Sequence, residues 1–183
     1  LSTFDLEGKK IYDPACSTGE FLSSIKHVYP NTYLIGQDLN TGMIEFAKKH
    51  HADINELHVG DSIFPCTPLE SVDFIFFRFL NLSVLSAEQA LTYFCKIANC
   101  CKNGGILIAF GFTPVLLSSE VFSLLGLEIL QKTGYSQEND SIFQYYVLKK
   151  TRPIPELSYK NFRIFNFSIL QTNLLQNAKS FFP

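Results

Sequence analysis

Residues 11–22 read IYDPACSTGEFL, and this short stretch decides the fold class. Its first apolar residues indicate a buried strand that ends at Asp13. The segment 14–19 contains only small residues, which is typical of a tight turn whose backbone approaches a ligand closely. The apolar residues that follow, at helical spacing from Phe21 onward, predict a helix whose first N–H groups face that turn. Strand, tight turn and helix in this order predict the opening unit of an α/β domain.

The same alternation of strand and helix continues to Lys150. Ser86 and Gln89 have the spacing of a capping box, which predicts that a helix begins there. The segment KNGG at 102–105 predicts a turn before the last parallel strand. Strands are expected over residues 9–15, 32–38, 56–61, 71–79 and 106–112, helices over 19–29, 41–51, 86–101 and 118–126, and an antiparallel hairpin over 127–136 and 142–150. The sequence therefore predicts a doubly wound, mostly parallel α/β sheet with a C-terminal antiparallel hairpin.

Three of the predicted strands end in an acid: Asp13, Asp38 and Asp61. In a doubly wound sheet, ligands bind at the carboxyl ends of the strands, where the strand order reverses. An aspartate after a strand is also a common turn or helix N-cap residue, and that role suffices for any one of the three. Three such acids in succession favour a shared binding crevice, so we expect the three carboxylates to converge there.

Length and composition indicate one globular domain. The 183 residues are 46% hydrophobic and 17% charged, a balance typical of a folded chain with a sizeable core. We expect residues 1–150 to form this domain and residues 151–183, where the pattern becomes irregular, to form a C-terminal tail packed on it. The net charge of −2 gives no strong field for nucleic acid or an anionic membrane, so neither is expected as a partner.

The cysteine pattern indicates free thiols in a reducing compartment. The number of cysteines, five, is odd, and they form no CxxC pair. Neither the cysteines nor the four histidines have the spacing of metal ligands. We therefore expect no metal site. Residues 1–10 lack the apolar core of a signal peptide, and the longest apolar stretch is too short for a membrane span. A cytoplasmic protein is expected.

The chemistry of the small-residue turn separates two classes of cofactor. A dinucleotide fingerprint would place glycines where this chain has Ala15, Ser17 and Glu20. Glu20 together with Asp13 would put negative charge beside a diphosphate, so a nicotinamide-dependent oxidoreductase is the weaker alternative. A cationic nucleoside without phosphate, such as S-adenosylmethionine, fits these acids better.

The ordered motifs resemble those of the class I S-adenosylmethionine-dependent methyltransferases. DPACSTG (13–19) is similar to the family's D-x-G-x-G-x-G turn, and LIGQDLNTGMIEFAKKH (34–50) is similar to its second strand, acid and helix. HVGDSIF (58–64) resembles its third motif and VDFIFFRFLN (72–81) its fourth strand. CCKNGGILIAF (100–110) resembles the segment that leads into its fifth strand. The match runs from Lys10 to Lys150. The resemblance implies a Rossmann-like methyltransferase fold and S-adenosylmethionine as the cofactor.

The resemblance also implies a role for each matched site residue. Asp13 would lie near the methionine ammonium, and Asp38 would accept from both ribose hydroxyls. Asp61 would accept from the adenine amino group, with Ser62 donating to a ring nitrogen. The other expected cofactor contacts are Ala15, Cys16, Ser17 and Gly19 around the methionine part, Leu39 and Met43 at the adenine or ribose, and Phe77 and Arg78 beside the transferring methyl group, where Arg78 and Asn81 would also bind the acceptor. No catalytic residue follows from the resemblance.

Two positions depart from the family pattern, because Ala15 and Ser17 stand where glycine is usual. We expect the turn to avoid strongly positive φ at both positions, since a Cβ atom disfavours it. The implied function is transfer of a methyl group from S-adenosylmethionine to oxygen or nitrogen of a small-molecule acceptor. The alternative is a methyltransferase-like domain that binds cofactor or a partner without turnover.

Overall fold

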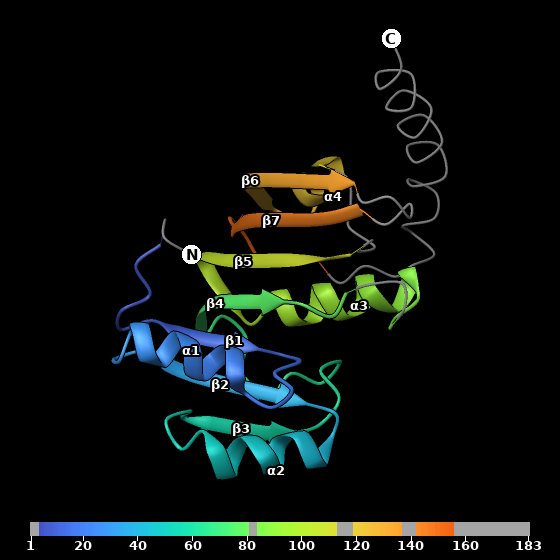
Figure 1. Cartoon of the computed structure of the whole chain (residues 1–183). Helices are drawn as coiled ribbons and strands as arrows, with labels where there is room; N and C mark the ends of the chain where they lie inside the picture. The colour runs from blue at the N-terminus through green and yellow to red at the C-terminus, as the bar shows by residue number, and fades with distance from the viewer. Residues whose placement is uncertain (1–3, 81–83, 113–118, 137–141, 156–183) are drawn as a thin grey trace.

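The computed structural model describes residues 4–80, 84–112, 119–136 and 142–155, which form alternating strands and helices (Figure 1). The strands are β1 (Lys10–Asp13), β2 (Tyr33–Asp38), β3 (Glu56–Val59), β4 (Val72–Phe77), β5 (Cys101–Phe112), β6 (Leu127–Ser136) and β7 (Ile142–Lys150). The helices are α1 (Glu20–Val28), α2 (Thr41–His50), α3 (Ala87–Ala98) and α4 (Ser119–Leu124). Every predicted strand and helix is present, and the capping box of Ser86 and Gln89 opens α3 as expected.

The strands form one seven-stranded sheet in the order β3-β2-β1-β4-β5-β7-β6. Neighbouring strands from β3 to β5 in this order are parallel, whereas β7 runs antiparallel to both β5 and β6. The prediction of a doubly wound, mostly parallel sheet with a C-terminal antiparallel hairpin is therefore confirmed. The strand order reverses between β1 and β4, so a ligand crevice is expected at the carboxyl ends of these two strands.

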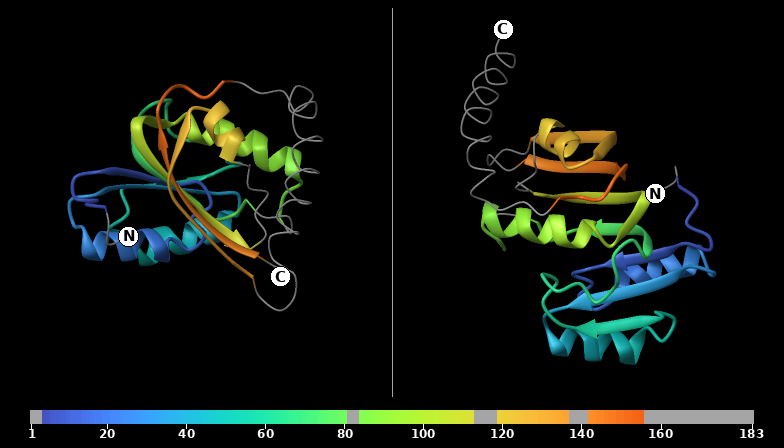
Figure 2. Two further views of the ribbon diagram at one scale, coloured as in Figure 1. Left: turned by 90° about the horizontal axis from the view of Figure 1, so that it is seen from above. Right: turned by 180° about the vertical axis from the view of Figure 1, so that it is seen from behind.

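The helices cover the two faces of the sheet, with α1 and α2 on one face and α3 and α4 on the other (Figure 2). Side chains alternate between these faces along each strand. In β1, for example, Ile11 belongs to the core with α1 and Tyr12 to the core with α3. The sequence of β4, VDFIFF, is almost continuously apolar because a parallel strand covered on both sides contributes to both cores.

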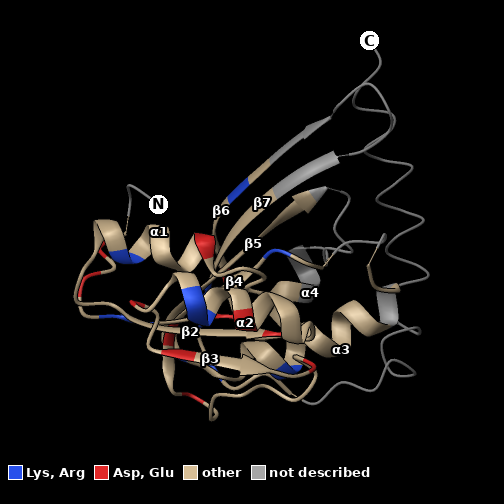
Figure 3. Ribbon diagram, turned by 60° about the horizontal axis from the view of Figure 1, so that its bottom comes forward, with Lys and Arg blue, Asp and Glu red and all other residues tan. Residues whose placement is uncertain are grey.

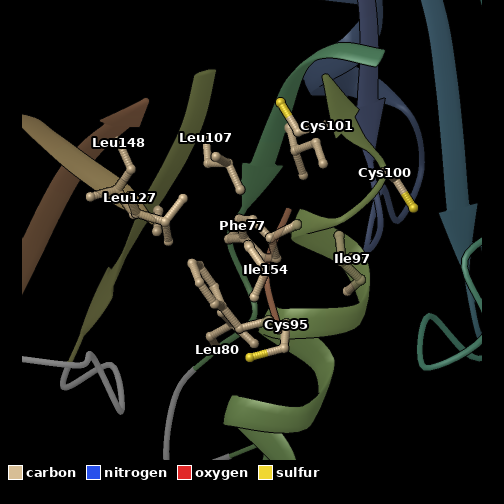
Figure 4. Close-up of a cluster of buried hydrophobic side chains, with 14 of the residues drawn as sticks. Phe77, Leu80, Cys95, Ile97, Cys100, Cys101, Leu107, Leu127, Leu148 and Ile154 are labelled. Atoms are coloured by element: carbon tan, nitrogen blue, oxygen red, sulfur yellow. The ribbon is translucent and has the colours of Figure 1, made fainter. Parts of the chain in front are cut away.

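The core on the α3 face gathers side chains from the sheet, from α3 and from the segment after β7 (Figure 4). Phe77 is fully buried there, and the centre of its ring is 4.8 Å from that of Phe94. Ile154 belongs to the same core, so the chain stays attached to the domain beyond the end of β7. Most of the predicted C-terminal tail, residues 156–183, lies outside the described residues.

The prediction of a turn at 102–105 is wrong, because these residues are part of β5. Val72 pairs with Cys101 whereas Phe74 pairs with Ile106, so β5 bulges between the two pairs. Gly104 allows this bulge with a left-handed φ of 83°, which glycine adopts without strain. A turn and a glycine-containing bulge look alike in the local sequence, and the pairing with β4 decides between them.

None of the described helices has both the length and the apolarity that a bilayer crossing requires. All five cysteines are free thiols, and four of them are buried. Acidic and basic positions are interspersed along the described ribbon (Figure 3). Within the described ranges, no group of three or more potential metal-ligating side chains is brought together.

A buried lysine at the end of β7 ties the hairpin to the rest of the domain. The Lys150 side chain is fully buried, and its Nζ donates to the backbone carbonyls of Cys101, at 2.7 Å, and Asn99, at 3.3 Å. A carboxylate oxygen of Glu70 lies 3.6 Å from the same Nζ. The Asn99 side chain in turn donates to the carbonyl of Ile154 and accepts from its N–H, both at 2.9 Å. The end of the hairpin is thereby held against the turn between α3 and β5.

Lys150→Met is expected to lower the free energy of unfolding by about 1–3 kcal/mol, because it keeps the side-chain length but removes the buried donor to the Cys101 carbonyl and one of the donors to the Asn99 carbonyl. Lys149→Met is the matched control, since Lys149 precedes Lys150 in the chain and its side chain is only half-buried. Urea denaturation of both variants and the wild type measures the difference. Equal stability of the two variants would show that the carbonyls find other partners.

Candidate functional site

The loop between β1 and α1, residues 14–19, is held on the carboxyl end of β2 by hydrogen bonds. The N–H of Cys16 donates to the carbonyl of Gln37, and the N–H of Ser17 donates to Oδ2 of Asp38, both at 2.9 Å. Gly19, the N-cap of α1, has a left-handed φ of 80°, and its N–H donates to the carbonyl of Cys16 at 3.0 Å. The segment is therefore the tight turn that its small residues predict.

Ser17 has a left-handed φ of 52°, so the prediction that the loop avoids positive φ at both non-glycine positions is wrong at this residue. A side chain in this conformation costs about 1–2 kcal/mol. The hydrogen bond from the Ser17 N–H to the Asp38 carboxylate is charge-assisted and offsets that cost. At Ala15 the φ is not positive, and there the prediction is confirmed.

Gly36, within β2, lets the loop lie directly against the sheet. A Cβ atom added at this glycine would lie 2.7 Å from Sγ of Cys16 and 2.8 Å from Cδ2 of Leu57. The Cys16 side chain is only 2% exposed, and burial raises the pKa of its thiol to about 12. Cys16 is therefore protonated at neutral pH and serves as a packing residue that seats the loop, not as a nucleophile.

Gly36→Ala is expected to destabilise the protein by about 1–3 kcal/mol, because the added methyl group forces the loop and Leu57 apart. Gly60→Ala is the matched control, since its new Cβ would meet only Nε2 of Gln37, at 3.4 Å, an ordinary contact distance. Thermal unfolding followed by circular dichroism compares the two variants. If both melt together with the wild type, the close approach of Cys16 to Gly36 does not constrain the loop.

Asp38, at the end of β2, presents a half-buried carboxylate with acceptor capacity on both oxygens. Oδ1 accepts from the N–H of Asn40 and Oδ2 from the N–H of Ser17, both at 2.9 Å. Each oxygen has two lone pairs and so retains one acceptor position. The apolar side chains of Leu39 and Met43, which follow in the chain, are 72% and 39% exposed. Paired acceptors beside exposed apolar surface suit a ligand with neighbouring hydroxyls and a flat ring.

Asp61, which follows β3, keeps one oxygen open for a ligand. Its Oδ1 accepts from the Tyr93 hydroxyl at 2.5 Å and from the N–H of Ile63 at 3.0 Å. Its Oδ2 has no hydrogen bond to any described residue. Burial, and then the hydrogen bond to the Asp61 carboxylate, raise the pKa of Tyr93 to about 12, so the phenol remains a donor at neutral pH.

Ser62 joins the loop after β3 to the loop after β1. Its hydroxyl is buried and donates to the carbonyl of Pro14. The hydroxyl hydrogen is therefore engaged inside the protein, and donation from Ser62 to a ring nitrogen stays a prediction. The contact instead places Asp61 beside the 14–19 loop.

Asp13 and Arg78 form a buried ion pair across the point where the strand order reverses. The Asp13 side chain is fully buried, and its Oδ1 accepts from the N–H of Ala15 at 3.1 Å. Its Oδ2 accepts from Nη2 of Arg78 at 2.6 Å and from Nε at 3.1 Å. Burial raises the pKa of Asp13, and the Arg78 guanidinium opposes that shift. Arg78 follows β4, so the pair links the carboxyl ends of β1 and β4.

The structure gathers most of the predicted residues around the 14–19 loop. Asp13, Asp38 and the loop after β3 are all hydrogen-bonded to backbone groups of this loop. Phe77 differs from the others, because its side chain points into the core on the α3 face and leaves only its backbone near the crevice (Figure 4). Asn81 lies outside the described residues.

Sequence reasoning missed two residues that support the site. Tyr93 comes from α3 and sits in an apolar helical stripe, so nothing local indicates that its hydroxyl bonds Asp61. Gln37 is buried in β2, and its Oε1 accepts from the Tyr12 hydroxyl at 2.5 Å and from the N–H of Cys66 at 2.9 Å. A single amide after the apolar residues of β2 and directly before Asp38 is the signal that could have found Gln37.

A comparison with known families matches residues 11–105 to the family described as Methyltransferase domain. The matched segment extends from β1 into β5 and covers more than half of the 183 residues. It contains every residue of the site described above.

Two curated proteins are similar in sequence. Isonocardicin synthase of Nocardia uniformis subsp. tsuyamanensis is 38% identical over 150 residues, which cover 82% of this chain and 49% of that protein. Malonyl-[acyl-carrier protein] O-methyltransferase of Hahella chejuensis is 29% identical over 115 residues, which cover 62% of this chain and 39% of that protein. The chain thus spans about half or less of the length of these curated relatives.

Solved structures share the fold. A TehB-like SAM-dependent methyltransferase from Corynebacterium glutamicum superposes with a TM-score of 0.63 at 18% identity, covering 82% of this chain and 84% of that one. At this level of identity the likeness concerns the fold alone. The predicted Rossmann-like methyltransferase fold is confirmed.

Proposed function

This chain belongs to the methyltransferase domain family, and we propose that it transfers a methyl group from S-adenosylmethionine to oxygen or nitrogen of a small-molecule acceptor. S-adenosylmethionine is the cofactor of this family. The observation that carries the proposal is the Asp38 carboxylate, which keeps an acceptor position on each oxygen beside the exposed side chains of Leu39 and Met43. A ribose with two neighbouring hydroxyls is the complementary ligand.

The residues present fit this cofactor at its nucleoside end. Asp38 would hold the ribose, since a carboxylate with both oxygens available matches two adjacent hydroxyls. Asp61 would accept from the adenine amino group through Oδ2, because Oδ1 already serves Tyr93 and Ile63. Leu39 and Met43 would cover the flat faces of the ring system. The 14–19 loop would contribute backbone groups at the methionine end.

The start of α1 argues against a diphosphate-containing cofactor. A dinucleotide would place its diphosphate at this helix terminus, where backbone N–H groups favour negative charge. Here the first residue of α1 is Glu20, and its carboxylate lies 3.6 Å from Nε2 of His51. An acid at this point would repel phosphate, whereas a cofactor without phosphate meets no such repulsion.

When bound, S-adenosylmethionine supplies a methyl group that is already activated by the sulfonium. The role of the chain is then to hold donor and acceptor in line and to exclude water from the reacting atoms. Asp13 is ion-paired and fully buried, and Tyr93 keeps its proton at neutral pH, so neither is suited to act as a general base. A neutral amine acceptor, or an oxygen that ionises before transfer, needs no such base.

A small acceptor agrees with the charge distribution of the described chain, in which acidic and basic positions are interspersed (Figure 3). The relative from Hahella chejuensis is named as an O-methyltransferase, which supports oxygen as the acceptor atom. Arg78 follows β4, at the position where the family resemblance puts the acceptor. Its guanidinium is partly exposed and is therefore accessible from the crevice.

Calorimetric titration with S-adenosylmethionine and S-adenosylhomocysteine tests cofactor binding, and both compounds are expected to bind. Incubation with a panel of phenols, carboxylic acids and amines, followed by mass spectrometry of the nucleoside product, tests the transfer. S-adenosylhomocysteine is the expected product. Release of methylthioadenosine would contradict methyl transfer, because a different carbon–sulfur bond would have broken. Binding without turnover across the panel would favour a cofactor-binding domain.

Asp38→Ala is expected to weaken the binding of S-adenosylhomocysteine by about 1–3 kcal/mol, because it strands hydroxyls that the carboxylate would pair. Glu45→Ala is the matched control, since Glu45 is an exposed acid on the neighbouring helix α2. Calorimetry gives both affinities, and circular dichroism verifies that both variants fold. Unchanged affinity in the Asp38 variant would place the ribose elsewhere.

A further inference from the structure

The rim of the crevice contains a single basic residue. The rim segments at the carboxyl ends of β1, β2, β3 and β4 are residues 13–19, 38–43, 60–64 and 77–80. They contain the acids Asp13, Asp38 and Asp61 and one residue of the Lys or Arg type, Arg78. A ligand with one anionic group therefore has one cationic partner available in these segments.

Arg78 separates Asp13 from the crevice. The Asp13 side chain is 0% exposed, whereas the Arg78 side chain is 26% exposed. Oδ2 of Asp13 already accepts two hydrogen bonds from the guanidinium, and Oδ1 accepts one from the N–H of Ala15. A ligand ammonium would have to displace the guanidinium to reach this carboxylate. Of the two charged groups in the ion pair, the Arg78 guanidinium therefore faces the crevice.

The guanidinium is held in one orientation before any ligand binds. Its Nε and Nη2 donate to Asp13, and Nη2 also donates to the carbonyl of Ala15 at 3.3 Å. The central carbon of the guanidinium lies 4.7 Å from the centre of the Phe21 ring, a cation–π contact. The Nη1 nitrogen has no hydrogen-bond partner in the described part of the chain. A fixed guanidinium with unused N–H groups is a ready partner for a carboxylate.

We propose that Arg78 binds the carboxylate of the methionine part of S-adenosylmethionine and that Asp13 positions Arg78. This inference rests on the proposed function, because it assigns the second end of the same cofactor. S-adenosylmethionine has two cationic groups, the sulfonium and the ammonium, and a single anionic group. Its carboxylate therefore has one charge-complementary residue in the rim segments, while Asp38 and Asp61 accept from the nucleoside.

The test compares S-adenosylmethionine with decarboxylated S-adenosylmethionine, which keeps the ammonium and the sulfonium but lacks the carboxylate. Calorimetry is expected to show that the wild type binds S-adenosylmethionine at least about tenfold more tightly than the decarboxylated form. The variant used is the double substitution Asp13→Asn with Arg78→Met, because removing Arg78 alone would leave a buried unpaired charge. It is expected to bind both ligands equally, because the carboxylate then has no cationic partner in the rim segments.

Asp13→Asn alone separates the two possible roles of the acid. If Asp13 only positions Arg78, this variant keeps a guanidinium and still prefers the carboxylated ligand. If Asp13 instead held the ammonium, the affinity for both ligands would fall together, because both carry that group, and the assignment would be overturned. Arg78→Lys is expected to restore part of the preference that the double variant loses, since it returns a positive charge without the planar fork.

The outcomes distinguish this inference from the proposed function. Equal wild-type affinity for the two ligands overturns the role of Arg78 while leaving S-adenosylmethionine as the cofactor. In that case a carboxylate on the acceptor, which has the same chemistry, becomes the partner of the guanidinium. Failure of the wild type to bind either ligand overturns the proposed function and this inference together.

Discussion

The ion pair between Asp13 and Arg78 spans the point at which the sheet changes direction. β1 and β4 are neighbours there, but the chain leaves them toward opposite faces, so their loops diverge and leave a crevice between them. A buried carboxylate without a partner is strongly unfavourable, and Arg78 supplies that partner from the far side of the crevice. The position of the 14–19 loop and the sign of the charge at the rim both depend on this contact.

The loop is supported from every neighbouring strand end. β2 contributes the carbonyl of Gln37 and the carboxylate of Asp38, and the loop after β3 contributes the hydroxyl of Ser62. These contacts explain how a turn with alanine and serine at two glycine positions keeps a tight path. Ser17 adopts the left-handed conformation of a glycine because a carboxylate accepts from its N–H. A glycine in the loop would allow the loop to approach the sheet closely. Here Gly36 in β2, which has no side chain, allows that approach instead.

The polar groups of the rim divide into those that the protein uses and those that it leaves open. The Asp13 carboxylate, which was expected to lie near the ligand ammonium, and the Ser62 hydroxyl are both engaged inside the fold. Asp38, one oxygen of Asp61 and part of the Arg78 guanidinium remain available among the described residues. The available groups are the carboxylate acceptors of Asp38 and Asp61 and the guanidinium donor of Arg78, which are the groups that the proposed binding mode uses. This set of free groups supports S-adenosylmethionine as the ligand more specifically than the sequence motif does by itself.

The sequence by itself determined the elements and their class, because hydrophobic periodicity acts over a few residues: VDFIFF reads as a strand buried on both faces, and Ser86 with Gln89 reads as a helix start. It also located Asp13, Asp38 and Asp61 at strand ends. Only the tertiary structure decided which of these groups stay free, since their partners, Arg78 for Asp13 and Tyr93 for Asp61, come from distant parts of the chain. The same reason explains the left-handed Ser17, whose N–H pairs with Asp38, and the bulge at Gly104, which is set by the pairing with β4.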